Sequence, residues 1–124
     1  MKNSAKKWKG TPYPEMILNL PEIDIQLEGV RGWLLQAKDK QVVFFDMQPA
    51  CEVPSHSHCA QWGFVVEGEL RLVIGGKSRV YRKGDCYFIP KGIVHSGIPL
   101  TKVNAIDIFD DPKRYRIRGE RIEK

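Results

Sequence analysis

The sequence has no long hydrophobic run. Its longest uncharged apolar stretches, such as residues 42–45 and 64–66, are far shorter than the roughly 20 residues that a membrane-spanning helix needs. The basic residues 1–9 are also not followed by the apolar stretch of about 7 to 15 residues that is typical of a secretory signal. We therefore expect no membrane partner and a location in the cytoplasm.

Cysteine is also scarce. The chain has three cysteines, Cys51, Cys59 and Cys86, and no two of them have the C-x-x-C spacing. An odd number without this spacing indicates neither a disulfide framework nor a zinc ribbon, so we expect reduced thiols. Cys51 and Cys86 are interpreted as small apolar residues of the core, whereas Cys59 follows His58 directly and could lie near the histidines.

Acidic residues are few near both ends of the chain. Residues 1–14 contain four lysines and no acid, and residues 113–124 contain six basic and two acidic residues. Each end contributes +4 to the net charge of +5, which leaves −3 for residues 15–112. A nucleic-acid site needs a basic stripe on the folded body, so we expect no nucleic-acid partner.

Length and composition indicate one folded domain. With 124 residues, of which 42% are hydrophobic and 28% charged, the chain can form one core and does not resemble a disordered polymer. Three prolines before residue 22 disfavour a helix and leave at most an extended arm near residues 23–27. We interpret residues 1–28 as an N-terminal arm, residues 29–112 as the folded body and residues 113–124 as a basic tail.

Helical periodicity of useful length is absent, and short β-prone runs separated by glycine, proline and aspartate take its place. Gly75-Gly76 suits the positive φ angles of a two-residue hairpin turn, and Asp39-Lys40 occupies a similar position between two runs. The regular spacing predicts an all-β sandwich or barrel. The predicted strands are 32–37, 42–48, 61–66, 69–74, 78–82, 86–89, 94–98 and 103–109.

The three histidines of the chain form the one cluster with obvious chemistry. His56 and His58 are two residues apart, so an extended strand would project both imidazoles from the same face. This spacing fits a pair of metal ligands. His95 could complete a three-histidine set if the fold brought the two segments together, which the spacing alone does not establish.

Two segments of the sequence resemble the two motifs of the cupin superfamily. In the second motif, glycine, proline, glycine and histidine fall on Gly84, Pro90, Gly92 and His95, all with the family spacing, and Pro99 replaces the later asparagine. The first motif is matched by a separate set of residues at its two histidines and its final glycine. These residues are His56, His58 and Gly68.

The resemblance implies an all-β jelly-roll barrel, a double-stranded β-helix, with one divalent metal ion in its lumen. His56, His58 and His95 would be ligands, and Gln61 stands where the family has a glutamate. Either the amide oxygen of Gln61 is a ligand or water occupies that position. Imidazole-rich sites suit zinc, iron, nickel or copper, and manganese is a further candidate. Neutral ligands leave the ion its full charge and thus make it a stronger Lewis acid.

The resemblance does not identify the reaction, because metal cupins include dioxygenases, isomerases, cyclases and lyases. We expect an enzyme that acts on a small carbonyl-bearing or enolisable molecule in the lumen. The alternatives are a non-catalytic module that binds or senses a metal or small ligand, and a metal-free structural cupin. Strand parity allows Tyr87 and Asp107 to face the lumen as substrate-binding residues. Small cupins commonly pair, so we also expect a homodimer.

Overall fold

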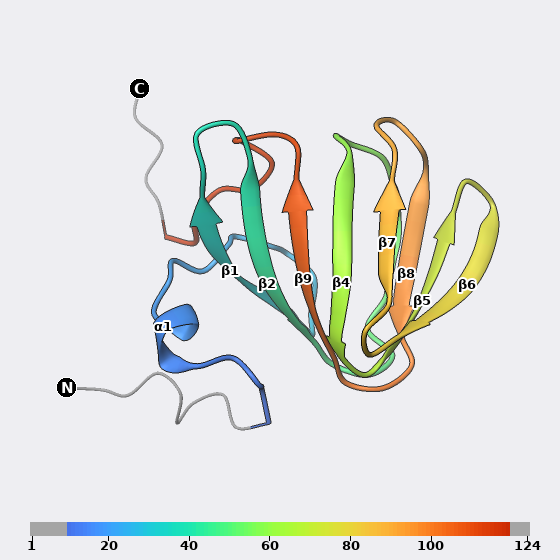
Figure 1. Ribbon diagram of the computed structural model, residues 1–124, viewed down its shortest axis with the longest axis horizontal. Helices are drawn as coiled ribbons and strands as arrows, with labels where there is room; N and C mark the ends of the chain where they lie inside the picture. Colours follow the sequence, from blue (N-terminus) through green and yellow to red (C-terminus); the bar gives the residue numbers. More distant parts are fainter. Residues whose placement is uncertain (1–9, 120–124) are drawn as a thin grey trace.

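The computed structural model describes residues 10–119, which form nine strands and one short helix (Figure 1). The elements are α1 (Glu15–Leu18), β1 (Val30–Gln36), β2 (Gln41–Met47), β3 (Val53–His56), β4 (Gln61–Glu67), β5 (Glu69–Ile74), β6 (Lys77–Arg82), β7 (Cys86–Ile89), β8 (His95–Pro99) and β9 (Val103–Phe109). Within residues 10–119, the one helix present is too short to cross a membrane.

The strands form two antiparallel sheets that enclose a common core. The five-stranded sheet has the order β1-β2-β9-β4-β7, and the four-stranded sheet has the order β3-β8-β5-β6. Alternate residues of each strand point inward, and the largest buried cluster combines inward residues of both sheets. The predicted all-β jelly-roll is thereby confirmed.

All eight predicted strands are present, with boundaries that differ by two residues or fewer. The hairpin between β5 and β6 turns at Gly75 and Gly76, whose φ angles are +56° and +83°, as the two-residue turn requires. The ninth strand, β3, was not predicted. It is short, contains Pro54 and lies at the edge of its sheet, which is where a strand can accommodate a residue without an amide proton.

Part of the N-terminal region packs on the outside of the five-stranded sheet. Tyr13, Leu18 and Trp33 form a buried cluster there, and the hydroxyl of Tyr13 lies 2.7 Å from the backbone oxygen of Phe45. The short helix α1 was not predicted, because the prolines before residue 22 disfavour a helix. The helix has only four residues and fits between Pro14 and Pro21. The helix therefore covers one part of this face, beside β1 and β2 (Figure 1).

The segment that follows β9 turns back and meets the residues that precede β1. The amide of Asp24 donates to the backbone oxygen of Arg116 over 2.8 Å, and the amide of Arg118 donates to that of Glu22 over 2.7 Å. Ile23 and Ile117 form an antiparallel bridge between the two segments. Both segments contribute to the wall of an internal cavity.

Candidate metal centre

A cavity of about 620 Å³ lies between the two sheets. This volume is in the range of small-molecule sites in proteins. Most of its wall is apolar, and its polar lining includes every residue that the sequence nominated for the site. These residues are His56, His58, Gln61, Tyr87, His95 and Asp107.

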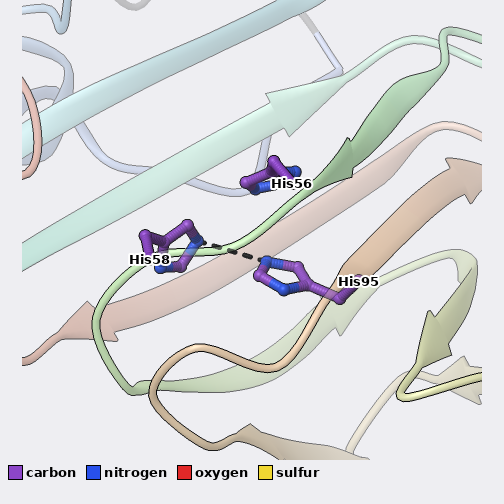
Figure 2. Close-up of side chains that lie close together, drawn as sticks. All are labelled: His56, His58 and His95. Carbon is purple, nitrogen blue, oxygen red and sulfur yellow. Dashed lines mark hydrogen bonds between the residues drawn. The ribbon is translucent and has the colours of Figure 1, made fainter.

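The three histidines come together from two segments that are distant in the sequence. His56 is the last residue of β3 and lies directly opposite His95, the first residue of β8. His58 lies two residues beyond the end of β3, in a loop and not on an extended strand, and its backbone oxygen accepts a hydrogen bond from the amide of Gly92 over 2.9 Å. Figure 2 shows the three imidazoles turned toward one another.

Backbone carbonyls fix the orientation and the tautomer of all three imidazoles. The Nδ1 atoms of His56, His58 and His95 lie 2.7, 2.8 and 2.9 Å from the carbonyl oxygens of Pro54, Cys59 and Ile93, respectively. Because a carbonyl only accepts, each Nδ1 carries the proton and each Nε2 keeps a free lone pair. Metal-binding histidines are commonly held by such outer hydrogen bonds.

The free nitrogens are close enough to share one ion. One ligand atom from each histidine lies within 4.8 Å of the others, and the Nε2 atoms of His58 and His95 are 3.2 Å apart (Figure 2). Two lone pairs that face each other at this distance repel unless a cation or a proton lies between them. The histidine cluster is therefore able to bind a metal ion.

Burial keeps the imidazoles of His58 and His95 in the form that binds metals. Removal from water lowers the pKa of His58 to about 4, and it also lowers the pKa of His95. The positive charge of Arg114 acts in the same direction on both rings. Both imidazoles are thus neutral near pH 7, as metal coordination requires.

A second polar cluster lies in the same cavity, on the inner face of the five-stranded sheet. Asp107 of β9 accepts hydrogen bonds from Gln61 Nε2, 2.6 Å from Oδ2, and from the Tyr87 hydroxyl, 2.9 Å from Oδ2 and 3.1 Å from Oδ1. Burial raises the pKa of Asp107 to about 7, although both hydrogen bonds oppose the shift. Burial and the Asp107 charge raise the pKa of Tyr87.

The amide of Gln61 presents an unused acceptor. Its nitrogen donates to Asp107, whereas its Oε1 is buried and has no hydrogen-bond partner among residues 10–119. Buried acceptors in native proteins are nearly always satisfied. The three imidazoles therefore suit a divalent ion, and the Gln61 amide oxygen is a further unused acceptor in the wall of the same cavity.

Sequence and structure comparisons agree on the family. The family model of the cupin domain matches residues 43–108, which is more than half of the chain. This chain belongs to the cupin family. A search of curated proteins found no match.

Solved structures of other cupins share the fold. An RmlC-like cupin from Shewanella frigidimarina is 28% identical, with a TM-score of 0.68 over 76% of this chain and 86% of that chain. KdgF from Halomonas sp. is 23% identical, with a TM-score of 0.67 over 74% and 86% of the two chains. Salicylate 1,2-dioxygenase from Pseudoaminobacter salicylatoxidans is 17% identical, with a TM-score of 0.67 over 77% of this chain and 31% of that chain.

Sequence reasoning missed Gly63, on which the second cluster of this cupin depends. Gly63 lies in β4 between its register partners Tyr87 of β7 and Asp107 of β9. A Cβ atom at this position would lie 2.1 Å from the Tyr87 ring, so the missing side chain makes room for tyrosine to cross β4. A single glycine inside a predicted strand was the available signal.

Proposed function

We propose that this cupin is a metal-dependent enzyme that transfers a proton on a small carbonyl-bearing or enolisable molecule in the lumen. In this proposal His56, His58 and His95 bind one divalent ion, and Gln61 Oε1 is its fourth protein ligand. Zinc, iron, nickel, copper and manganese are the candidate ions. A bound divalent ion would supply Lewis-acid polarisation of a substrate oxygen.

The observation that carries this proposal is the position of Asp107. An enzyme of this kind needs an ionisable group besides the metal ligands, whereas a binding module can have inert walls. The Asp107 carboxyl lines the same cavity as the histidines and is almost fully buried, with 1% of its surface exposed. A carboxyl in this position can exchange a proton with a substrate in the cavity.

The hydrogen bonds of Asp107 suggest a role for each oxygen. Oδ2 receives the short bond from Gln61 and lies 2.9 Å from the Tyr87 hydroxyl, whereas Oδ1 has the Tyr87 contact alone, at 3.1 Å. Oδ1 therefore has the greater capacity to accept a proton. Tyr87 and Gln61 orient the carboxyl, and most of the cavity wall around it is apolar.

Deuterium exchange tests the proposed reaction class. We would incubate the metal-loaded protein with a panel of small aldehydes, ketones and keto acids in D2O and follow the protons next to the carbonyl by NMR. We expect exchange of at least one compound, slowed by about 100-fold or more in Asp107→Asn, the scale of a lost general base. Asp46→Asn is the matched control, because Asp46 is also buried but does not line the cavity.

The result separates the enzyme from the non-catalytic module. Exchange at the wild-type rate in Asp107→Asn would remove Asp107 as the proton carrier. Absence of exchange for every compound, together with metal-dependent binding of one of them, would support the binding or sensing module instead.

A further inference from the structure

Three basic residues lie in the cavity wall on the segment that follows β9. They are Lys113, Arg114 and Arg116. None of them is in an ion pair with another residue of the described range 10–119. The two acidic residues in the same wall are Asp24 and Asp107, and the second is buried and occupied by Gln61 and Tyr87. The wall therefore has an excess of positive charge that no ion pair within residues 10–119 neutralises.

Arg114 has the most constrained position of the three. Its guanidinium lies over the rings of Tyr115 and Phe109, with centroid distances of 4.4 and 5.7 Å. Its Nε atom is buried and has no hydrogen-bond partner among residues 10–119. A buried donor on a charged group is costly when it is unsatisfied, which indicates that an acceptor from outside the protein completes it.

Arg114 lies near the histidine cluster. The Phe109 ring contacts both groups, because its centroid is 5.6 Å from that of His58 and it lies under the Arg114 guanidinium. The Arg114 charge also contributes to the lowered pKa of His58 and His95. A small molecule that reaches the histidines can thus also reach Arg114.

The segment that carries Arg114 is fixed to the barrel on both sides. Gln41, with 1% of its surface exposed, donates from Nε2 to the backbone oxygens of Pro112 and Tyr115, each over 3.0 Å. Its Oε1 accepts from the amide of Tyr115 over 2.8 Å. On the other side, the amide of Asp24 donates to the backbone oxygen of Arg116. These bonds preorganise the cation, which lowers the entropic cost of binding.

We infer that Arg114 binds a carboxylate of the substrate, so the substrate class is small carboxylic acids. This inference rests on the proposed function, which concerns the carbonyl part of the substrate. It adds Arg114 as the residue that binds the carboxylate of the same substrate. The planar guanidinium matches a carboxylate with two parallel hydrogen bonds, and its contacts with two aromatic rings restrict its position. Arg114 is therefore a specificity-determining residue.

Calorimetric titration with matched probes tests the inference on the full-length protein. Benzoate and benzamide differ in charge but hardly in shape, and inorganic phosphate tests the other common anion. We expect benzoate to bind more tightly than benzamide and to lose about 10-fold to 100-fold in affinity in Arg114→Gln, because a hydrogen-bonded charge is removed. Arg114→Lys keeps the positive charge but loses the planar pair of donors. Its benzoate affinity should therefore lie between those of the wild type and Arg114→Gln.

The matched control is Arg79→Gln. Arg79 also stacks on a tyrosine, 4.7 Å from the Tyr81 centroid, but it does not line the cavity. Its replacement should leave benzoate affinity unchanged. Melting temperatures within a few degrees of wild type would show that each variant is folded.

Repeating the titration after metal removal separates this inference from the proposed function. Benzoate affinity that depends on Arg114 with and without metal, and that persists in Asp107→Asn, supports the subsite even if deuterium exchange fails. Equal affinity for benzoate and benzamide would overturn the inference, as would unchanged benzoate affinity in Arg114→Gln. Phosphate binding that is tighter than benzoate binding and lost in Arg114→Gln would overturn the choice of carboxylate.

Discussion

Each face of the five-stranded sheet departs in part from what is expected of a sheet that covers a core: the inner face carries polar residues among its apolar ones, and the outer face exposes apolar residues. The inner face of β4, β7 and β9 carries the buried residues Tyr87 and Asp107 and the partly buried Gln61, which are joined by hydrogen bonds. The outer face of the same strands exposes apolar residues, among them Trp62 with 39% and Phe88 with 58% of their surface accessible. Folding alone favours the reverse arrangement. From this comparison we predict that the inner face contacts a ligand and that the outer face contacts a second copy of the chain.

The outer apolar residues follow the strand register. Trp62 is paired with Phe88 on one side and with Ile108 on the other, Ile108 is paired with Val42, and Val42 with Leu35. One apolar row thus crosses all five strands. The next row, which contains Trp33, is covered by Tyr13 and the N-terminal segment, whereas this one retains exposed members.

The largest effect is expected from replacing the three histidines, a change that should leave the outer face of the five-stranded sheet unaffected. Replacing His56, His58 and His95 together with Ala should reduce bound metal from about one ion per chain to nearly none, because no other imidazole exists in the chain. Each single replacement should lower the content well below one ion. Elemental analysis measures the effect, and Trp62→Ala on the outer face should leave the metal content unchanged. Full metal content in the triple variant would show that the ion binds elsewhere.

The second prediction concerns a substitution on the outer face of the five-stranded sheet. We expect the wild-type protein to be a homodimer, and Phe88→Glu to convert it to a monomer, since a charge in an apolar contact is costly to bury. Sedimentation at tens of micromolar, where an interface of about 1,600 Å² should hold, measures the change. Lys77→Glu, an exposed change on β6 of the other sheet, is the control. A monomeric wild type under these conditions would contradict the prediction.

A third, smaller effect concerns protein stability and compares two glycines, Gly63 and Gly97, one in each sheet. Gly63→Ala places a Cβ 2.1 Å from the Tyr87 ring and should lower stability by about 1 to 3 kcal/mol through overpacking. Denaturant unfolding measures this loss. Gly97→Ala, on β8 in the other sheet, meets the end of the Leu72 side chain at 2.9 Å and should cost less, because that side chain can move. Equal losses would show that the Tyr87 position does not depend on Gly63.

Local patterns were sufficient to predict eight of the nine strands in residues 10–119, because hairpins and β-prone runs are encoded by neighbouring residues. Alternation allowed Tyr87 and Asp107 to face inward without requiring it, and both residues line the cavity. It could not predict the bond between Gln61 and Asp107, which are 46 residues apart in sequence and meet through strand pairing. The same holds for Arg114. A basic residue near the end of a chain has the same sequence pattern whether it is solvated or held in a cavity wall.

The three histidines of the cluster were predictable for a different reason. Their spacing is one of the motifs in which the chain resembles other cupins, and that resemblance supplied the long-range contact between His58 and His95. The local structure was less predictable, since β3 ends at His56 and His58 lies in the following loop. Orientation by three backbone carbonyls does not depend on side-chain identity, so no sequence pattern indicates it.

The smallest predicted effect concerns Gln61, where the inner face departs from the family motif. If its amide oxygen is a ligand, Gln61→Glu should keep the metal and add a negative charge to the ligand set. This charge would lower the Lewis acidity of the ion and shift preference toward harder ions such as manganese, since carboxylates suit these better than imidazole-rich sites do. The change also removes the donor to Asp107, so the new carboxylate and Oδ2 of Asp107 must share a proton.

The competing interpretation is that Gln61 only orients Asp107 and does not bind the ion. It predicts the same zinc-to-manganese affinity ratio in wild type and in Gln61→Glu, whereas direct ligation predicts a ratio shifted toward manganese. Gln61→Ala is the companion variant and should weaken metal binding by no more than about 10-fold to 100-fold, because the three histidines supply most of the affinity. Competition calorimetry on the three proteins decides between the two roles: identical ratios would exclude Gln61 as a ligand and leave its unsatisfied Oε1 to be explained by water or substrate.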